Sequence, residues 1–285
     1  MKTLVIIQAR IGGTRFPGKV AMQLAGMSVL EHAVRRARHK GYTVAIASPS
    51  SSAEGLAWSA DFRRNVPDNK GRPGFVPIYF ADTDENDVLG RVAHTARWAS
   101  DMLRFTGGEG YGCVVRLTAD CPFLPVSAID AVAEAVTSGQ NDYCETRSDP
   151  SSRPNGIDAQ AVTMELLQEA SAKCVYPEGR EHLTSALLGL AEKPGRVQQL
   201  EGMRLDDLPG FRLTLDTPDD LVRYQAMAAH LSVDPTAGRP TLMELRDLHR
   251  RMPELFCVET YTPDGPFGMP MTQTFYGDNR YGGGT

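Results

Sequence analysis

The chain has 285 residues, of which 41% are hydrophobic and 23% are charged, as is usual for globular proteins. Its net charge of −5 argues against a general nucleic-acid-binding protein, which would carry a basic excess. No apolar run approaches the roughly 18 residues that span a bilayer, and Gln8 and Arg10 interrupt the N-terminal apolar run before it could complete a signal peptide. Five scattered cysteines without a CxxC pair predict neither a disulfide framework nor a zinc site. We therefore expect a cytoplasmic protein with no membrane or nucleic-acid partner.

The first half of the chain predicts alternating strands and helices. Strands are expected at 4–7, 43–47, 77–80 and 113–118. Helices are expected after caps at Ser28 and Ser51, from Asp84 or Asn86 through Trp98, and over 128–136. An exposed excursion is expected at 66–76. This alternation is typical of βαβ units, so we predict an α/β fold of three layers (α/β/α) around a Rossmann-like, mainly parallel sheet.

The second half is less regular. Strands are expected from Tyr143, over 156–162 and over 211–215, and helices over 164–172 and 181–190. Thr217 and Thr241 are expected to cap two further helices. From Thr262 onwards the sequence is rich in glycine and aromatic residues and predicts an extended tail.

The most informative segment is the loop Gln8–Lys19, which follows the first strand. It combines glycines with three cations in ten residues, which are Arg10, Arg15 and Lys19. Backbone amides, arginine and lysine together can match the charge of a triphosphate at several oxygens. The loop is not a Walker A motif, which would need Ser or Thr at Val20, and it is not GxGxxG. The alternative is a polar surface loop whose cations occur by chance.

This loop and five later segments resemble the SpsF-like cytidylyltransferases, which are relatives of the CMP-KDO and CMP-sialic acid synthetases. The loop matches the family's opening signature with Ile7-Gln8-Ala9-Arg10, followed by Gly-Gly-Thr-Arg-x-Pro-Gly-Lys. The later segments are DVLGR (87–91), VRLTADCP (115–122), NGID (155–158), REHLT (180–184) and LTLDTPDDL (213–221). Ala119 departs from the glycine that is usual in the family, and the excursion at 66–76 is longer than usual. The resemblance does not extend beyond about residue 232.

The resemblance implies a nucleotide-diphospho-sugar transferase-like fold. It also implies a Mg²⁺-dependent enzyme that transfers CMP from CTP to a hydroxyl group of a sugar or sugar acid, releases pyrophosphate and serves polysaccharide biosynthesis. We expect residues 1–232 to form the nucleotidyltransferase domain, with a small mixed lobe at about 140–200 for the acceptor or for dimerisation. Residues 233–285 would add a C-terminal helix and the extended tail, whose aromatic residues are compatible with a homodimer.

Two carboxylates are candidate metal ligands and catalytic residues. Asp120 and Asp216 each follow a predicted strand, so both would lie at the same edge if the two strands belong to one sheet. Mg²⁺ prefers one or two carboxylates together with phosphate oxygens and water. The alternatives are that Asp120 caps a turn and that Asp216 lies just outside a helix N-terminus.

The remaining site residues follow from the loop and from the resemblance. Lys19 and Arg10 are expected to be catalytic, because preplaced cations stabilise the charge that develops during attack on the α-phosphorus. The expected nucleotide-binding residues are Gln8, Ala9, Arg10, Gly12, Gly13, Thr14, Arg15, Lys19, Arg91 and Arg116. The expected acceptor-binding residues are Asp158, Arg180, Glu181 and His182. Structural ion pairs for Arg91 and Arg116, and a surface or capping role for His182, are the alternatives.

Two other functions stay open at this point. A glycosyltransferase of the GT-A type, using a nucleotide-sugar donor, would also place an acidic metal-binding motif after a strand. A catalytically silent binding or assembly protein could share the fold. The cationic loop argues against the first, because a nucleotide-sugar donor carries only a diphosphate, and the joint presence of Lys19, Asp120 and Asp216 argues against the second.

Overall fold

The computed structural model describes residues 1–12, 15–52, 66–67, 73–74, 76–146, 156–190, 197–200, 211–262 and 271–276. Two predicted nucleotide-binding residues, Gly13 and Thr14, lie outside these ranges. So do the helix expected after Ser51 and most of the excursion at 66–76.

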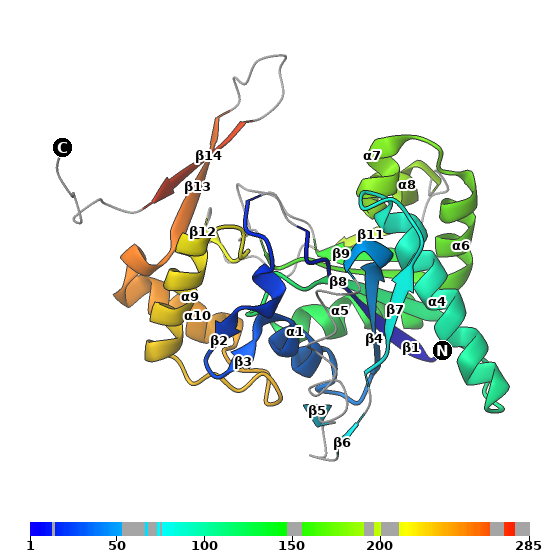
Figure 1. Cartoon of the computed structure of the whole chain (residues 1–285), viewed down its shortest axis with the longest axis horizontal. Coiled ribbons are helices and arrows are strands. Elements are labelled where there is room, and N and C mark those ends of the chain that lie inside the picture. Colours follow the sequence, from blue (N-terminus) through cyan, green and yellow to red (C-terminus); the bar gives the residue numbers. More distant parts are fainter. Residues whose placement is uncertain are drawn as a thin grey trace.

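A seven-stranded sheet forms the centre of the molecule (Figure 1). In spatial order its strands are β11 (Val197–Leu200), β9 (Tyr143–Thr146), β10 (Ala159–Thr163), β8 (Cys113–Thr118), β1 (Thr3–Gln8), β4 (Thr43–Pro49) and β7 (Ile78–Ala81). Strand β10 runs antiparallel to both of its neighbours, and the other neighbouring pairs are parallel. The prediction of a mainly parallel sheet is confirmed.

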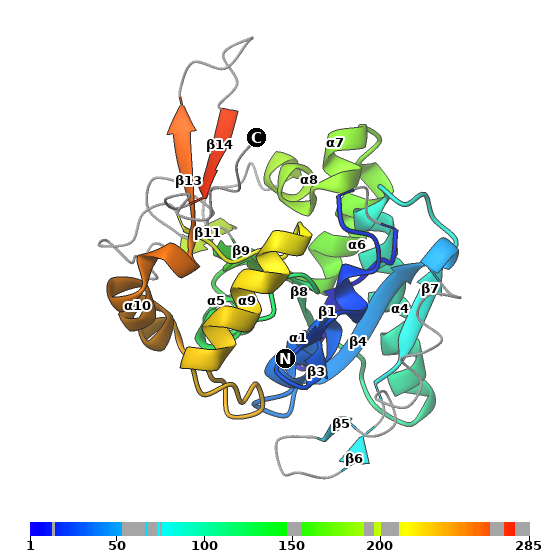
Figure 2. The same cartoon turned by 60° about the vertical axis from the view of Figure 1, so that its left-hand side comes forward.

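Helices cover both faces of this sheet (Figures 1 and 2). On one side lie α1 (Val29–Ala37) and α5 (Val126–Thr137), and on the other lie α4 (Val88–Phe105), α6 (Met164–Lys173) and α8 (Leu183–Leu190). The predicted α/β/α sandwich is therefore confirmed.

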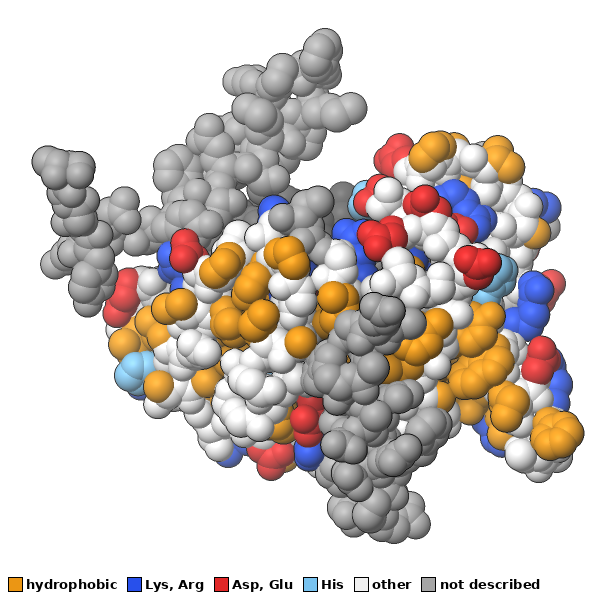
Figure 3. Space-filling model, viewed as in Figure 1, with side chains coloured by type: hydrophobic (Ala, Val, Ile, Leu, Met, Phe, Trp, Pro, Cys, Tyr) orange, Lys and Arg blue, Asp and Glu red, His pale blue; other side chains and the backbone are white. Residues whose placement is uncertain are grey.

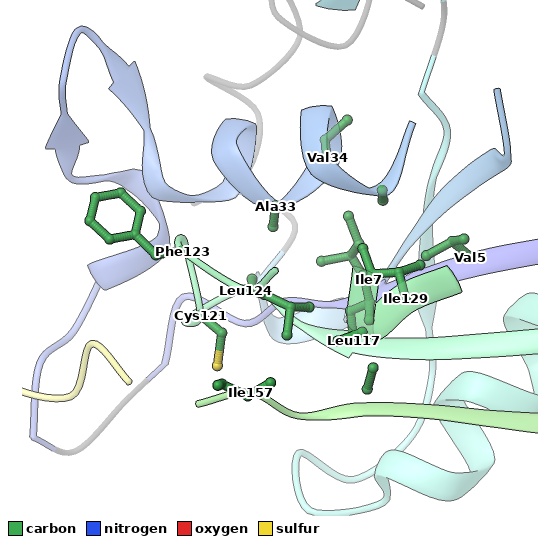
Figure 4. Packing of buried hydrophobic residues seen from close by; sticks show 14 of the residues in the cluster. Val5, Ile7, Ala33, Val34, Leu117, Cys121, Phe123, Leu124, Ile129 and Ile157 are labelled. Atoms are coloured by element: carbon green, nitrogen blue, oxygen red, sulfur yellow. The ribbon is translucent and has the colours of Figure 1, made fainter. Parts of the chain in front are cut away.

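The strand sequence explains the two layers. Successive side chains of a strand point to opposite faces. Accordingly Val5 and Ile7 of β1 belong to the hydrophobic cluster under α1 and α5, while Leu4 and Ile6 belong to the cluster under α4 and α6. Figure 4 shows the first cluster, in which Ala33 of α1 faces the sheet. A continuous apolar run in β1 is thus the expected pattern for a strand that is covered on both faces.

The C-terminal part packs on the α1 side. It contains α9 (Pro218–His230), α10 (Leu242–Arg251) and a three-stranded sheet of β12 (Phe211–Arg212), β13 (Cys257–Thr262) and β14 (Met271–Tyr276). The buried guanidinium of Arg36 on α1 donates to the carbonyl oxygens of Pro122, at 2.6 Å, and of Arg239, at 2.8 Å. This side chain fastens the segment after residue 232 to the loop that follows β8. The division of the chain at 232, with a small lobe at 140–200, stays a prediction.

Several shorter elements complete the described ranges. They are η1 (Lys19–Ala21), β2 (Gln23–Leu24), β3 (Met27–Ser28), η2 (Ser50–Ser52), β5 (Val66–Pro67), β6 (Pro73–Gly74), α7 (Pro177–Glu181) and η5 (Pro253–Leu255). None of the helices in the described ranges is both long enough and apolar enough to cross a membrane.

Three expectations about these elements need correction. The helix expected over 181–190 is two helices, α7 and α8, because Pro177 starts a short helix and the backbone is extended at His182. The N-cap of α4 is Asp87, since Asp84 forms a turn by accepting a hydrogen bond from the backbone N–H of Asn86. Residues 271–276 of the expected tail form a strand, which pairs with β13.

His32, on α1, is a fully buried titratable residue. Its Nε2–H donates to the carbonyl oxygen of Leu24 at 2.7 Å, and within the described ranges its Nδ1 has no partner. Burial lowers the pKa of His32 to about 4, from 6.5 in an exposed chain. The unfolded state therefore takes up a proton before the folded state does, so stability is complete above pH 6.5 and falls as the pH drops towards 4.

Between pH 6.5 and pH 4, we expect protonation of His32 in the unfolded state to reduce the free energy of unfolding by up to about 3 kcal/mol. Urea unfolding at pH 7 and pH 4.5 measures the loss. The control variant His32→Gln retains an amide donor for Leu24 but cannot take up the proton, and it should lose less stability on acidification. Equal losses in the two proteins would contradict the assignment.

Candidate active site

A cavity of about 230 Å³ opens at the carboxyl ends of β1 and β8. Its wall is formed by residues 8–12 and 15–16, by Lys19 and Val20, and by 118–120 together with Asp216. Strands β1 and β8 are parallel neighbours, and Gln8 is paired with Thr118 at their ends. The loops that leave these two strands must therefore meet, which is why the cationic loop faces Asp120.

The loop after β1 is held by contacts on both sides. The backbone N–H of Ile11 donates to Ser52 Oγ at 3.1 Å. A side chain at Gly12 would meet the carboxylate of Glu85, since a Cβ there would lie 3.1 Å from it. Gly18 has a φ of 72°, in the left-handed region, and turns the chain into η1, which carries Lys19. The loop conformation therefore aims Lys19 at the cavity.

Lys19 lies between the two predicted carboxylates. Its Nζ is 2.7 Å from Asp120 Oδ2 and 3.0 Å from Asp216 Oδ1. Burial opposes the charge of Lys19, but the two carboxylates outweigh this effect and the pKa of Lys19 is raised. Burial also opposes ionisation of Asp216, yet Lys19 and the other donors around it hold the pKa of Asp216 below its usual value. Lys19 and Asp216 are therefore both charged at neutral pH.

Asp216 is the centre of a larger charge cluster. Besides Lys19, it contacts Arg15 Nη2 at 3.2 Å and Arg212 Nη1 at 3.2 Å, and Thr214 Oγ1 donates to it at 2.9 Å. Arg212 also donates to Asp220 at 2.5 Å. Asp220 in turn accepts from the backbone N–H of Asp216 at 2.9 Å, which orients the start of α9. The capping residues of α9 thus hold Asp216 in place.

The two carboxylates converge for a reason other than the predicted one. The strand expected at 211–215 ends at Arg212 and pairs with β13, so the premise that both carboxylates follow strands of one sheet is wrong. Instead, the backbone N–H of Leu215 donates to the carbonyl oxygen of Asp120 at 2.9 Å. This single hydrogen bond lays the segment before α9 along the end of β8 and brings Asp216 to Asp120.

Two of the predicted nucleotide-binding arginines act behind the cavity wall. Arg91 is buried and donates to the carbonyl oxygens of Asp84 and Glu85, so it supports the turn that lies beside Gly12. Burial, and then the charge of Arg10, lower the pKa of Arg91. Arg10 itself lines the cavity and makes no ion pair within the described ranges.

Arg116 fixes the side chain of Gln8. Its Nε and Nη2 both donate to Gln8 Oε1, at 3.2 and 2.6 Å, and its Nη1 donates to Gln160 Oε1 at 2.9 Å. Because guanidinium groups can only donate, Gln8 must present its oxygen to Arg116 and keep its NH₂ group for the cavity. Burial lowers the pKa of Arg116, against the charges of Asp158 and Asp120.

A buried polar network continues from Gln160 and was missed by the sequence analysis. Gln160 Nε2 donates to Thr184 Oγ1 at 2.5 Å, and both Thr184 and Tyr143 donate to Glu145 Oε2, at 2.8 and 2.6 Å. The available signal was a set of polar residues inside two otherwise apolar strands, Glu145 in β9 and Gln160 in β10. The network links the cavity wall at Gln8 to α8.

The four predicted acceptor-binding residues lie outside the cavity wall formed by the described residues. Arg180 donates to Asp87 Oδ2 at 2.6 Å and to the carbonyl oxygen of Ser171 at 2.8 Å, which fastens α7 to the start of α4. Glu181 and His182 are exposed, at the end of the molecule where Figure 3 shows acidic and basic side chains mixed over α7 and α8. Asp158 Oδ2 accepts from the backbone N–H of Gly156. Their role towards an acceptor stays a prediction.

Comparison with known proteins shows a similarity to cytidylyltransferases. A family model described as cytidylyltransferase matches residues 4–60, which contain the cationic loop. The spore coat polysaccharide biosynthesis protein SpsF of Bacillus subtilis is 25% identical over 251 residues, which cover 85% of this chain and 92% of that protein. The chain is thus similar to cytidylyltransferases, in residues 4–60 to the family model and over most of its length to SpsF. This similarity supports an enzyme of the nucleotidyltransferase class, as the resemblance implied.

Solved structures share this fold. A cytidylyltransferase from Leptospira borgpetersenii superposes with a TM-score of 0.65 at 20% identity and covers 90% of this chain and 96% of that one. A structure of CMP:2-keto-3-deoxy-manno-octonic acid synthetase complexed with CTP superposes with a TM-score of 0.50 at 16% identity and covers 81% of this chain and 99% of that one.

Proposed function

We propose that this protein transfers CMP from CTP to a hydroxyl group of a sugar or sugar acid and releases pyrophosphate, with Mg²⁺ as its cofactor. The observation that carries the proposal is the placement of Lys19 between Asp120 and Asp216, on the wall of a cavity that the cationic loop also lines. Cations and carboxylates side by side suit a reaction in which phosphate charge is both bound and redistributed.

Two arginines of the cavity lining, Arg10 and Arg15, can contact the triphosphate. Arg10 lies on the wall and has no carboxylate partner in the described ranges, so it has its charge to offer a phosphate. Arg15 is 68% exposed and contacts Asp216 from the outside, where it can turn towards the leaving pyrophosphate. Because both cations already line the cavity, they would stabilise the charge that develops in the transition state.

The residues present also fit a magnesium ion. In the described part of the chain no group of three or more His, Cys, Asp or Glu side chains is placed to hold a metal ion, but Asp120 and Asp216 supply two carboxylates close together. That is the protein share of a site in which phosphate and water complete the coordination. When bound, Mg²⁺ would neutralise charge on the phosphate oxygens. Asp120 and Asp216 would hold it.

The relatives support the substrate side of the proposal. The name of SpsF places that protein in polysaccharide biosynthesis, and the solved synthetase was complexed with CTP. By the same resemblance we propose that Asp158, Arg180, Glu181 and His182 face the acceptor, within a lobe at about 140–200 that also serves a homodimer. Similarity to the cytidylyltransferase family model favours nucleotidyl transfer over the glycosyltransferase alternative.

The proposal is tested with a series of nucleoside triphosphates. With Mg²⁺ present, CTP should raise the Tm more than ATP, GTP or UTP does. Incubation of the protein with CTP, Mg²⁺ and a panel of sugars and nonulosonic acids should then release pyrophosphate for at least one acceptor. If no triphosphate raises the Tm, the nucleotidyl-transfer proposal is wrong.

The variant Arg116→Met should weaken CTP binding about tenfold, which corresponds to about 1.4 kcal/mol. Methionine keeps the length of the side chain but releases Gln8 Oε1, so the amide of Gln8 is free to rotate. Calorimetric titration with CTP gives the affinity. The matched control is Arg97→Met, which removes an exposed arginine that donates to Gln168 away from the cavity. Equal affinities in the two variants would contradict an orienting role for Arg116.

A further inference from the structure

The ammonium group of Lys19 stands where a divalent cation would have to bind. Its Nζ lies within hydrogen-bond distance of both inner carboxylate oxygens, at 2.7 Å from Asp120 Oδ2 and 3.0 Å from Asp216 Oδ1. A magnesium ion shared by these two oxygens would need about 2.0–2.1 Å to each of them. The two cations cannot occupy the same space, so a metal ion that bridges the carboxylates must displace Lys19.

The charge around the carboxylates points in the same direction. Three cations, Lys19, Arg15 and Arg212, contact the carboxylates of Asp120, Asp216 and Asp220. Among the residues that the structure describes, cations and anions are thus equal in number in this cluster. A divalent cation that approaches the nucleotide-free cluster meets no excess of negative charge from these residues, and it competes with an ammonium group that is already in place.

A triphosphate changes this balance. It brings several negative charges into the cavity and supplies new acceptors for the Lys19 ammonium, which can then leave the inner oxygens of Asp120 and Asp216. We infer that Lys19 excludes divalent cations from the carboxylate pair until a nucleoside triphosphate binds, so that metal and nucleotide enter the site together. This inference rests on the proposed function, because it takes a nucleoside triphosphate to be the ligand of the cavity.

The inference can be tested by measuring metal binding, without measuring turnover. If the ammonium and the metal compete for the same oxygens, removal of the ammonium must strengthen metal binding in the absence of nucleotide. A lysine that only supports the fold would produce no such gain. Metal affinity of the nucleotide-free protein therefore separates the two roles.

The experiment titrates the full chain with Mn²⁺ in the absence of nucleotide and follows the paramagnetic resonance signal of the free ion. We expect no saturable site in the wild type. Lys19→Met should gain one site, whose affinity should be at least about tenfold above the upper limit found for the wild type. The matched control is Lys40→Met, which removes an ammonium group 2.8 Å from the carboxylate of Asp130, and neither residue lines the cavity. It should behave as the wild type does. The double variant Lys19→Met, Asp120→Asn should lose the gained site.

Saturable Mn²⁺ binding by the nucleotide-free wild type that Asp120→Asn abolishes would overturn the inference, whatever the Lys19 variants do. So would a folded Lys19→Met protein with no gain in affinity, and Lys19→Gln provides a second neutral variant should the first not fold. The proposed function has its own outcome, which is the absence of any triphosphate effect on the Tm. A wild type that turns over CTP while Lys19→Met gains no Mn²⁺ site would therefore remove this inference alone.

Discussion

Asp216→Asn should lower kcat/KM by at least about a thousandfold, which is about 4 kcal/mol of transition-state stabilisation, and leave the chain folded. Asparagine keeps the shape of the side chain and can still accept from Thr214 and Arg212. It removes the negative charge, however, and with it the proposed metal ligand. The cations that now share Asp216 would face one another across a neutral amide.

The same substitution should not weaken CTP binding when metal is absent. The carboxylate of Asp216 repels the triphosphate, and its removal frees Lys19 and Arg15 to contact phosphate oxygens. We therefore expect metal-free CTP affinity to be equal to that of the wild type or greater. Loss of turnover together with retained binding would identify Asp216 as a group that acts in the reaction rather than in nucleotide capture.

Stability provides the check on folding. The pKa of Asp216 is lowered, so its carboxylate stabilises the folded state above the pKa of the unfolded chain, near 3.8, and this contribution is lost as the pH falls through the lower, folded value. At pH 7 the Asn variant should therefore be less stable by about 1 kcal/mol. Asp219→Asn, an exposed neighbour in the first turn of α9, is the control and should be unchanged in turnover. Turnover of Asp216→Asn at the wild-type rate would remove Asp216 from the reaction.

The nucleotide side of the cavity could be predicted because its signals are local. The continuous apolar run of β1, the glycines and cations that follow it, and the strand that ends before Asp120 are all short segments with a recognisable pattern. A parallel sheet then requires that the ends of β1 and β8 meet. That the cationic loop lies beside Asp120 follows from these facts.

The other contacts of the site could not be predicted, because they join residues that are far apart in the sequence. Nothing near Arg180 shows that its guanidinium binds Asp87, 93 positions earlier, and nothing near Arg116 shows that it holds Gln8. Hydrophobic patterns with a period of two or 3.6 residues show which side chains face a core, but they do not show which polar groups contact one another there. The convergence of Asp216 on Asp120 was predicted from a shared sheet and arises from one backbone hydrogen bond of Leu215.

Lys19→Met should lower kcat/KM as strongly as Asp216→Asn does, by at least about a thousandfold, but with the opposite effect on nucleotide affinity. Without the ammonium, the carboxylates of Asp120 and Asp216 face the triphosphate unneutralised. We expect CTP to bind at least about tenfold more weakly than to the wild type in the absence of metal. Calorimetric titration of both variants with CTP and chelator measures the contrast.

The pH dependence of CTP binding to Lys19→Met tests the cause. Two carboxylates that shared one ammonium, at 2.7 and 3.0 Å, become close like charges once it is removed, so the pKa of one of them must rise. A proton taken up as the pH falls below 7 would then replace part of the lost positive charge, and CTP affinity should recover. Lys19→Arg retains the charge and should show no such recovery. If Lys19→Met bound CTP as tightly as the wild type at pH 7, the ammonium would be a structural bridge between two carboxylates, and the phosphate contacts would have to come from Arg10 and Arg15.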